Sequence, residues 1–466
     1  MQLEHAFRIT NTACLALTGS GGKTTTLFQL ARSLSGTAGQ PVIVSATTHL
    51  HINQIKLADS HLTGVKPVDF SSSLGGQGGV ILVTGPLDGD RTSGLDNTTI
   101  DWLYGFCKQH ALPLLIEADG SRQRPLKAPS GNMSPLASSE PPIPGFVDAV
   151  VVVVGLSGLG QPLNGEFVHR PEVFARLSGL ALGATISSDA LLNVLTHPQG
   201  GLKNIPAQAR RMVLLNQADT PELQAQAQKL VGDLLTVYHS VIIASMGESQ
   251  IHAVYEPVAG IILAAGEASR FGRPKQLLDY HGQPFVRSVA KTALSSGLAP
   301  VVIVTGANAE AVEAAVCDLP VCIARNTDWK KGQSSSIKTG LQALGSHSLQ
   351  DGPPHFSEIG TNRDGVGAAI FLLADQPQVP STIIKALTDK HAQTLAAILA
   401  PLVAGQRANP VLFDRATFPN LMSLTGDVGG RAIFSNYPVV YLPWHDENLL
   451  MDIDTPADLE KLRKQE

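Results

Sequence analysis

The sequence has little of several features that would assign it to a narrow class of protein. It has four cysteines in 466 residues and no CxxC pair, which argues against a structural zinc site or a disulfide framework. A formal net charge of −5 gives no basic field for bulk nucleic-acid binding. No apolar run approaches the ~20 residues that span a bilayer, and no signal peptide is visible. We expect a soluble, cytoplasmic protein that binds neither nucleic acid nor membrane.

Short apolar runs alternate with amphipathic stretches along the whole chain. The expected strands are residues 14–17, 41–45, 80–83, 112–116, 149–154, 212–215 and 241–244, then 261–263, 301–304, 321–324, 369–373 and 397–403. The expected helices include residues 24–34, 221–235, 284–296 and 334–344. Apolar strands separated by helices indicate parallel sheets that are covered on both faces.

Two Gly-rich turns each follow a first strand, which predicts an α/β protein of two doubly wound domains, residues 1–250 and 251–466. The Pro- and Ser-rich segment 121–145 and the polar segment 345–367 are expected to be long loops.

The first Gly-rich turn, in LALTGSGGKTTT, has the composition of a phosphate-binding loop. Gly19, Gly21 and Gly22 permit positive φ values, which turn backbone N–H groups toward phosphate oxygens. Lys23 adds a full positive charge where the next helix begins, and the Thr24 hydroxyl is placed as a magnesium ligand. The turn departs from GxxxxGK[ST] and resembles the shorter ATP loops of Mur-type ligases. We therefore expect ATP or GTP to bind here.

Polar residues at the ends of two later strands support this expectation. Glu117 and Asp119 end the strand in LLIEADG, where a P-loop protein needs a carboxylate near magnesium. Asn216 and Asp219 occur in NQAD, which resembles the base-reading NKxD element. One such motif alone is as consistent with a turn of no function, but all three in order favour a nucleotide site. His49 is either a γ-phosphate sensor or a polar loop histidine, and both interpretations stay open.

The first half resembles a known family over about residues 10–246. TGSGGKTTT, ATTH, EADGSRQRPLKAP, EPPIP, VVGLSGLGQPL, VHRPE and LNQAD occur in the order found in YqeC-type accessory proteins of selenium-dependent molybdenum hydroxylases. Gln217 stands where a Lys is usual, and residues 131–139 are extra. The resemblance implies nucleotide-dependent maturation, with a molybdenum hydroxylase apoenzyme as partner.

The second Gly-rich turn, in LAAGEASRFGRPKQLL, differs in kind because no Ser or Thr follows its Lys. A loop bearing Gly266, Arg270 and Lys275 can wrap a triphosphate and neutralise the charge that develops on leaving pyrophosphate.

From here to about residue 464 the chain resembles nucleotidyltransferases of the molybdenum cofactor group. The resemblance implies a Rossmann-like fold of the nucleotide-diphospho-sugar transferase kind. The residues that it implies are, for the nucleotide, Leu263, Ala264, Ala265, Gly266, Ser334 and Ser335; for magnesium, Asp375 and Asp454; and for the acceptor, Asn409, Pro410, Asp427 and Arg431. The serines are also consistent with a helix N-cap cluster, and Asp452 with a solvated edge-strand residue.

Transfer of a nucleotidyl group requires these residue types, because an anionic acceptor must approach an anionic phosphate. We expect Lys275 to lie on the α-phosphate, Arg270 on the β- and γ-phosphates, and Mg²⁺ between Asp375 and Asp454. Ala265 stands where the guanylyltransferase branch has Gly, and its Cβ crowds the space of a purine, which favours CTP over GTP.

The sequence therefore predicts a cytidylyltransferase that joins CTP to the phosphate of Mo-molybdopterin, fused to an ATP-binding maturation domain. Two alternatives stay open: a chaperone that carries the cofactor under control of a nucleotide switch, and a guanylyl or sugar-phosphate nucleotidyltransferase. A complete set of Arg270, Lys275 and Asp375 favours an enzyme, since a carrier does not need it.

Overall fold

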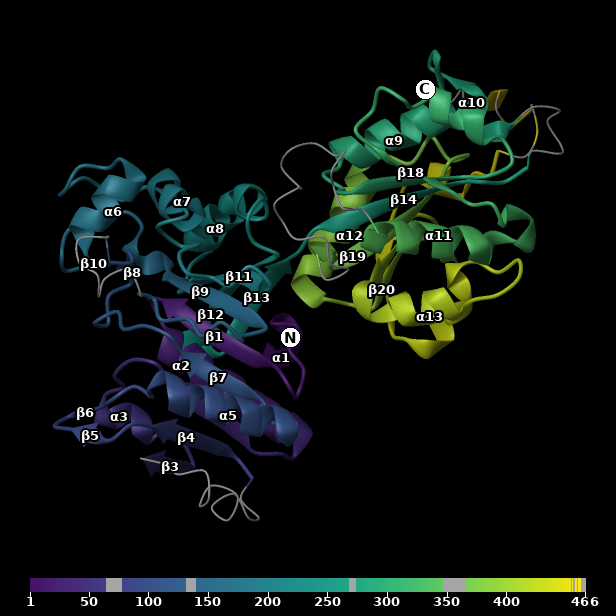
Figure 1. Cartoon of the computed structure of the whole chain (residues 1–466). Helices are drawn as coiled ribbons and strands as arrows, with labels where there is room; N and C mark the ends of the chain where they lie inside the picture. The colour runs from purple at the N-terminus through teal and green to yellow at the C-terminus, as the bar shows by residue number, and fades with distance from the viewer. Residues whose placement is uncertain are drawn as a thin grey trace. The chain divides into compact units, whose positions relative to one another are not determined.

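Each of two units of the chain, Met1–Tyr255 and Glu256–Glu466, is built on its own large sheet (Figure 1). The structure, a computed structural model, describes residues 1–63, 78–130, 140–267, 274–346, 365–453, 455, 457–458 and 460–461. Residues 251–255, expected in the second domain, belong to a strand that pairs antiparallel with its predecessor in the first unit.

The first sheet has nine strands in the order β13-β12-β11-β9-β1-β7-β2-β4-β3. Their bounds are β1 Cys14–Gly19, β2 Val42–Ala46, β3 Ser60–Thr63, β4 Val80–Thr84, β7 Leu114–Glu117, β9 Ala149–Gly155, β11 Arg210–Asn216, β12 Ser240–Ser245 and β13 Gln250–Tyr255. All pairings are parallel except that of β13 with β12. All the strands expected in this half are confirmed to within a few residues, whereas β3 and β13, short or half-exposed, were missed.

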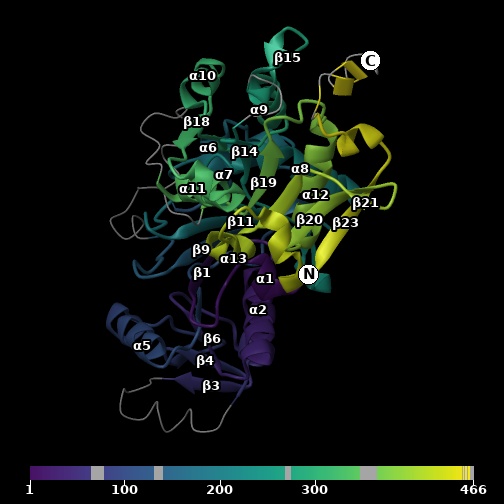
Figure 2. The same cartoon turned by 90° about the vertical axis from the view of Figure 1, so that its right-hand side faces the viewer.

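Helices cover both faces of this sheet, as expected for a doubly wound domain. They are α2 Lys23–Ala38, α5 Asn97–Gln109, α6 Pro171–Ser178, α7 Ser188–Thr196 and α8 Pro221–Leu234, with the short α1 Leu3–Ala6 and α3 Ile52–Ile55. Figure 2 shows α2 and α5 on opposite sides of β4. Leu103 and Cys107 of α5 pack with Ile43 and Ile81 on one face of the sheet.

Short strand pairs complete the unit: β5 Leu87–Asp88 with β6 Arg91–Thr92, and β8 Leu126–Lys127 with β10 Val168–His169. The β8 pair is the only regular element in the described part of segment 121–145, which was expected to be a loop.

The second sheet has eight strands, in the order β18-β17-β14-β19-β22-β20-β21 with β23 on the side of β20. Their bounds are β14 Val258–Ala264, β17 Val301–Thr305, β18 Cys322–Arg325, β19 Ala368–Leu373, β20 Ile398–Val403, β21 Gln406–Arg407, β22 Val411–Asp414 and β23 Val439–Trp444. The expected strands are present, but the sheet is mixed rather than wholly parallel, because β22 runs antiparallel to both β19 and β20. The hairpin β20–β21 reverses the chain just before β22.

The helices of the second unit are α9 Phe285–Ser295, α10 Ala309–Ala314, α11 Gln333–Ser346, α12 Ser381–Thr394 and α13 Phe418–Ser423. Smaller elements are the strand pair β15 Asp279–Tyr280 and β16 Gln283–Pro284, and the 3₁₀ turn η5 Trp329–Lys331. Most of the loop expected over residues 345–367 lies outside the described residues.

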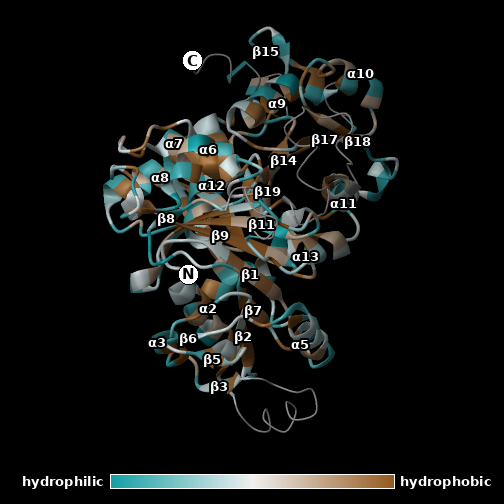
Figure 3. Ribbon diagram, turned by 60° about the vertical axis from the view of Figure 1, so that its left-hand side comes forward, coloured by the Kyte–Doolittle hydropathy of each residue, from teal (hydrophilic) through white to brown (hydrophobic). Residues whose placement is uncertain are grey.

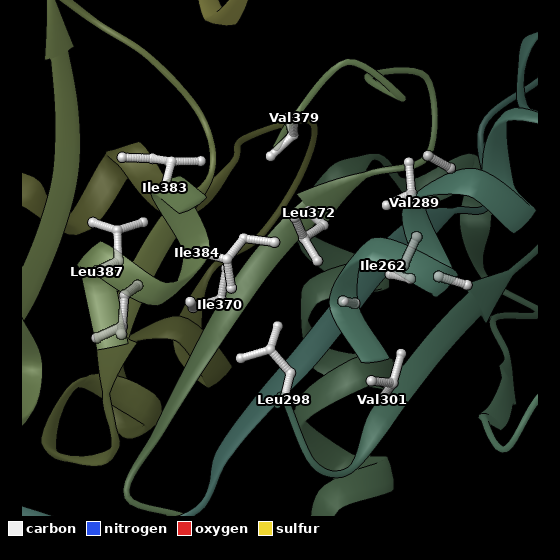
Figure 4. Packing of buried hydrophobic residues seen from close by; sticks show 14 of the residues in the cluster. Ile262, Val289, Leu298, Val301, Ile370, Leu372, Val379, Ile383, Ile384 and Leu387 are labelled. Carbon is white, nitrogen blue, oxygen red and sulfur yellow. The ribbon is translucent and has the colours of Figure 1, made fainter. Parts of the chain in front are cut away.

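An apolar layer fixes α9 and α12 on one face of this sheet (Figure 4). Ile262 of β14 and Leu372 of β19 meet Val289 of α9 and Ile384 of α12, all of them buried. Each such side chain contributes about 1.5–3 kcal/mol on burial. The layer therefore stabilises the packing of these helices against β14 and β19.

Figure 3 shows central strands such as β9 and β11 as mostly hydrophobic, whereas the helices mix hydrophobic and hydrophilic residues. Among the helices that the structure describes, none has the length and apolarity needed to cross a membrane.

β1 and β14, the first strand of each large sheet, are central, with later strands added on both sides. The turns after them therefore lie at the point where the strand order reverses. This is the usual ligand-binding edge of open α/β sheets.

Two candidate nucleotide sites

The turn after β1 requires glycine at three positions. Gly19, Gly21 and Gly22 have φ values of 95°, 77° and 119°. A Cβ on Gly22 would lie 2.2 Å from the Asn216 side-chain nitrogen, and one on Gly21 would lie 2.3 Å from the Gly155 backbone nitrogen. The turn is thus held between neighbouring segments in a conformation that only glycine adopts without strain.

Lys23 begins α2 and its ammonium is buried among carboxylates. Its Nζ donates to the Gly19 carbonyl oxygen at 2.7 Å and lies 3.2 Å from Asp119 Oδ1 and 4.0 Å from Glu117 Oε1. Burial raises the pKa of Glu117, and Lys23 offsets this only in part. For Asp119, burial also acts to raise the pKa, but Lys23 and Lys127 outweigh it and the pKa is lowered. Asp119 is therefore the charged partner of Lys23.

The structure separates the two carboxylates that the sequence grouped together. Glu117 Oε2 accepts the Thr24 hydroxyl at 2.8 Å, while Asp119 Oδ2 accepts from Thr18 Oγ1 and the Gly19 N–H. A hydroxyl and a carboxylate oxygen side by side are the hard donors that Mg²⁺ takes. Thr24 and Glu117 thus fit a magnesium ion, whereas Asp119 holds the turn.

Two side chains of this site were not singled out from the sequence. Gln54 Nε2 donates to Thr24 Oγ1 at 2.9 Å, so the segment after β2 reaches the hydroxyl that we expect on magnesium. Lys127 Nζ donates to Asp119 Oδ2 at 2.7 Å and also pairs with Glu140. The loop composition of EADGSRQRPLKAP concealed Lys127, since nothing in spacing alone brings residue 127 back to the turn.

The NQAD segment braces the turn. Asn216 Nδ2 donates to the Gly21 carbonyl oxygen at 2.7 Å, and its Oδ1 accepts from Met246 N, so its buried amide is engaged on both sides. Gln217 Oε1 accepts from Ser157, and Asp219 is exposed. His49 Nδ1 lies 3.0 Å from the Thr92 carbonyl oxygen. Base reading by Asp219 and phosphate sensing by His49 stay predictions.

The second unit holds a cavity of about 700 Å³ at the carboxyl edge of its sheet. Its lining is Leu263, Ala264, Ala265, Gly266, Glu267, Lys275, Gln276, Trp329, Lys330, Lys331, Gly332, Gln333, Ser336, Leu373, Ala374, Asp375 and Asp427. The turn after β14 and Lys275 are thereby brought to one cavity with Asp375, which is distant from them in sequence. Arg270 and Asp454, the other expected phosphate and metal residues, lie outside the described residues.

The turn after β14 is braced by backbone and amide contacts. Gln276, buried, donates through Nε2 to the carbonyl oxygens of Ala264 and Gly266 at 3.3 and 3.1 Å. Ala265 is buried, its carbonyl oxygen accepts from Ala307 N, and a Cβ on Gly306 would lie 2.8 Å from its methyl carbon. Because Gly306 has no side chain, it leaves space for the methyl group of Ala265, the residue that stands where the guanylyltransferase branch has Gly.

The serines at the start of α11 order the neighbouring wall. Ser334 Oγ donates to the Gly426 carbonyl oxygen, while Asn326 donates to the hydroxyls of Ser335 and Ser336. Of the three, Ser336 lines the cavity, whereas Ser334 and Ser335, the two expected at the nucleotide, are not among its described lining residues. Asp427 Oδ1 accepts from the Gln333 N–H at 3.0 Å, so it caps α11 besides lining the cavity.

The expected acceptor residues are divided. Asp427 lines the cavity, whereas Asn409, Pro410 and Arg431 are not among its described lining residues. Asn409 and Pro410 directly precede β22, whose Val411 pairs with Phe371 near the carboxyl end of β19. They therefore lie on the side of β19 away from β14.

Asp375 follows β19 at the cavity wall, and its neighbour Gln376 reaches the C-terminal segment. Gln376 Nε2 donates to Asp452 Oδ1 at 3.1 Å, so Asp452 is tied to the loop that carries Asp375. In the described ranges no three His, Cys, Asp or Glu side chains form a metal cluster. A carboxylate beside a cavity that can hold phosphate groups still suits Mg²⁺, which keeps waters and takes phosphate oxygens as ligands.

Two family models match the chain. Residues 15–172 match the YqeC protein family, and residues 260–440 match the MobA-like NTP transferase domain.

Two relatives found by sequence, YqeC and nicotine blue oxidoreductase, agree with the two models. An uncharacterized protein YqeC of Escherichia coli is 31% identical over 51% of this chain and 88% of that protein. Nicotine blue oxidoreductase of Paenarthrobacter nicotinovorans is 32% identical over 44% of this chain and 96% of that protein. The crystal structure of Rv0371c from Mycobacterium tuberculosis is 25% identical over 45% of this chain and 97% of its own, with a TM-score of 0.38. The chain therefore belongs to the YqeC family through its first unit and to the MobA-like NTP transferase family through its second.

Proposed function

We propose that the second unit is a cytidylyltransferase that transfers CMP from CTP to the phosphate of Mo-molybdopterin and releases pyrophosphate. The single observation that carries this proposal is the cavity that joins the Leu263–Gly266 turn, Lys275 and Asp375. A Gly-rich backbone, a cation and a carboxylate around one cavity suit a bound triphosphate whose α-phosphorus is attacked.

The residues divide the work of the transfer. The turn and Lys275 hold the triphosphate and offset the charge that develops on leaving pyrophosphate. Asp375 would hold Mg²⁺ with a phosphate oxygen, and the bound ion would supply charge neutralisation at the α-phosphate. The acceptor phosphate is already ionised at neutral pH, so the transfer does not require a general base.

Selection of CTP rests on Ala265 and its packing against Gly306. The methyl group narrows the space beside the turn, which disfavours a purine. A guanylyl or sugar-phosphate transferase remains an outcome of the test below.

For the first unit we propose nucleotide-dependent assistance in maturing a molybdenum hydroxylase, with ATP or GTP held by the Gly19–Thr24 turn. The Lys23 ammonium would release its contacts with the Gly19 carbonyl oxygen and Asp119 and would bind the phosphates instead. Thr24 and Glu117 would hold Mg²⁺, which supplies charge neutralisation at the phosphates. The hydroxylase apoenzyme is the proposed partner, and cytoplasmic placement and a link to selenium belong to the same proposal.

A relative named as an oxidoreductase suggests a second hypothesis for the second unit, a redox reaction in the same cavity. The combination of Lys275 and Asp375 beside a Gly-rich turn favours phosphate chemistry, and the two hypotheses predict different products.

The test incubates the full chain with Mg²⁺, Mo-molybdopterin and each of CTP, GTP, ATP and UTP. Pyrophosphate release and the mass of the cofactor product are measured. We expect CTP to give pyrophosphate in equal amount to a cofactor heavier by one CMP. Turnover without molybdopterin, or tight cofactor binding with no pyrophosphate from any nucleotide, would contradict the proposal.

A further inference from the structure

One wall of the second cavity is formed by η5. η5 contributes Trp329, Lys330 and Lys331, an aromatic ring and two cations in consecutive positions. Lys331 pairs with Asp328 at 2.9 Å, whereas the Lys330 ammonium lies 5.4 Å from the centre of the Trp329 ring. Trp329 is half-buried and packs against the apolar cluster between α11 and the sheet.

The order of the loops along the sheet edge indicates which end of the bound nucleotide lies beside η5. Asn409 and Pro410, proposed on the acceptor side, precede β22, which is on the β19 side of β14. Ala265, proposed to meet the base, packs against Gly306 after β17, on the opposite side. η5 follows β18, the next strand beyond β17, and so lies on the side of the base.

The chemistry of Trp329 suits a base and not a phosphate. Aromatic side chains hold nucleobases by stacking, which tolerates any base because each has a π face. One part of the ring is fixed by packing against the apolar cluster, so little freedom is lost on stacking. The ammonium of Lys330 near the ring belongs to an exposed side chain that a base can displace.

We propose that Trp329 is the stacking platform for the base of the bound nucleotide, a role that rests on the proposed nucleotidyltransferase function. Stacking on Trp329 supplies affinity for any base, while Ala265 and Gly306 select a pyrimidine over a purine by size. Substitution of Trp329 therefore weakens the binding of every nucleoside triphosphate that enters, and leaves the contacts to the triphosphate intact.

The test measures binding by calorimetry, with Mg²⁺ and without acceptor, in the full chain carrying Lys23→Ala so that the first turn does not contribute. The ligands are CTP and inorganic tripolyphosphate, which has no base. Trp329→Leu keeps an apolar side chain against the cluster, and Trp329→Phe keeps a ring. We expect Trp329→Leu to weaken CTP about 5- to 100-fold and Trp329→Phe to weaken it less, with tripolyphosphate unchanged in both.

The outcomes separate this inference from the proposed function. CTP binding that Trp329→Leu leaves unchanged overturns the inference alone, as does an equal loss of CTP and tripolyphosphate. In the pyrophosphate-release assay with Mo-molybdopterin, a raised KM for the acceptor with unchanged CTP affinity would move Trp329 to the acceptor side and overturn the inference too. Failure of the Lys23→Ala parent to bind CTP would overturn the proposed function itself.

Discussion

The two Gly-rich turns follow the first strand of their sheets, yet their surroundings are opposite. At the first turn Lys23 is buried between Asp119 and Glu117, and the pocket beside the turn has only about 30 Å³. At the second turn Lys275 lines a cavity of about 700 Å³, and the bracing comes from Gln276 and backbone contacts. The first turn is therefore held by charges, which a phosphate must displace from Lys23. The second leaves room for a nucleotide and more.

The largest effect is expected on the rate of nucleotidyl transfer, when the Asp375 carboxylate is removed from the cavity of the second unit. Asp375→Asn should lower nucleotidyl transfer by about 10³-fold or more, because the α-phosphate loses its metal-bound charge neutralisation. Pyrophosphate release from CTP measures this. Asp452→Asn is the matched control, since Asp452 is tied to the same loop through Gln376 but does not line the cavity. Transfer at the wild-type rate by Asp375→Asn would remove Asp375 from the site.

The next largest effect is expected on the free energy of unfolding, when the carboxylate that pairs with Lys23 at the first turn is removed. Asp119→Ala leaves the buried Lys23 and Lys127 without their shared carboxylate and should cost about 3–5 kcal/mol of unfolding free energy. Denaturant unfolding measures the loss. Asp219→Ala, at an exposed position, is the control and should change little.

The same carboxylate predicts a dependence on pH. The pKa of Asp119 is lowered on folding, so its contribution is full above the ordinary carboxyl pKa near 4. It is lost as the pH falls through the lower folded value. Wild-type unfolding free energy should therefore fall more steeply than that of Asp119→Asn in this acid range, and parallel curves would contradict the pairing.

A smaller effect tests the choice of base at the second turn. Ala265→Gly removes the methyl group packed against Gly306 and should raise the preference for GTP over CTP by about tenfold. Competition between the two nucleotides in the transfer assay measures the ratio. Ala264→Gly, one position earlier, is the control, and an unchanged ratio for Ala265→Gly would place base selection elsewhere.

The smallest effect concerns the amide that the sequence did not reveal. Gln54→Leu removes one hydrogen bond to Thr24 Oγ1 and should weaken Mg²⁺-dependent ATP binding a few-fold, about 1 kcal/mol. Substitution of the neighbouring, exposed Asn53 by Leu should leave the affinity unchanged. Equal losses from both variants would indicate a general disturbance of α3.

The sequence predicted the candidate site residues that lie close to the end of the strand before them. Both Gly-rich turns, Lys23 and Asp375 closely follow buried strands, and such apolar runs can be recognised from composition. Lys275, which lies well beyond the end of β14, was found from its motif instead. The contacts of Gln54, Lys127 and Trp329 could not be predicted from the sequence, because each residue belongs to a short element, α3, β8 or η5, whose position at the sheet edge is set by the tertiary fold. The antiparallel β22 was missed for a similar reason, since its direction is set by the preceding hairpin.

The central claim is that the two turns serve two separate nucleotide reactions. It is tested most directly by assaying the full chain and its Lys23→Ala and Asp375→Asn variants for phosphate release from ATP and for pyrophosphate release from CTP with Mo-molybdopterin. The account predicts that Lys23→Ala loses only the ATP reaction and Asp375→Asn only the CTP reaction. Loss of both reactions in either variant, with the fold intact, would contradict it.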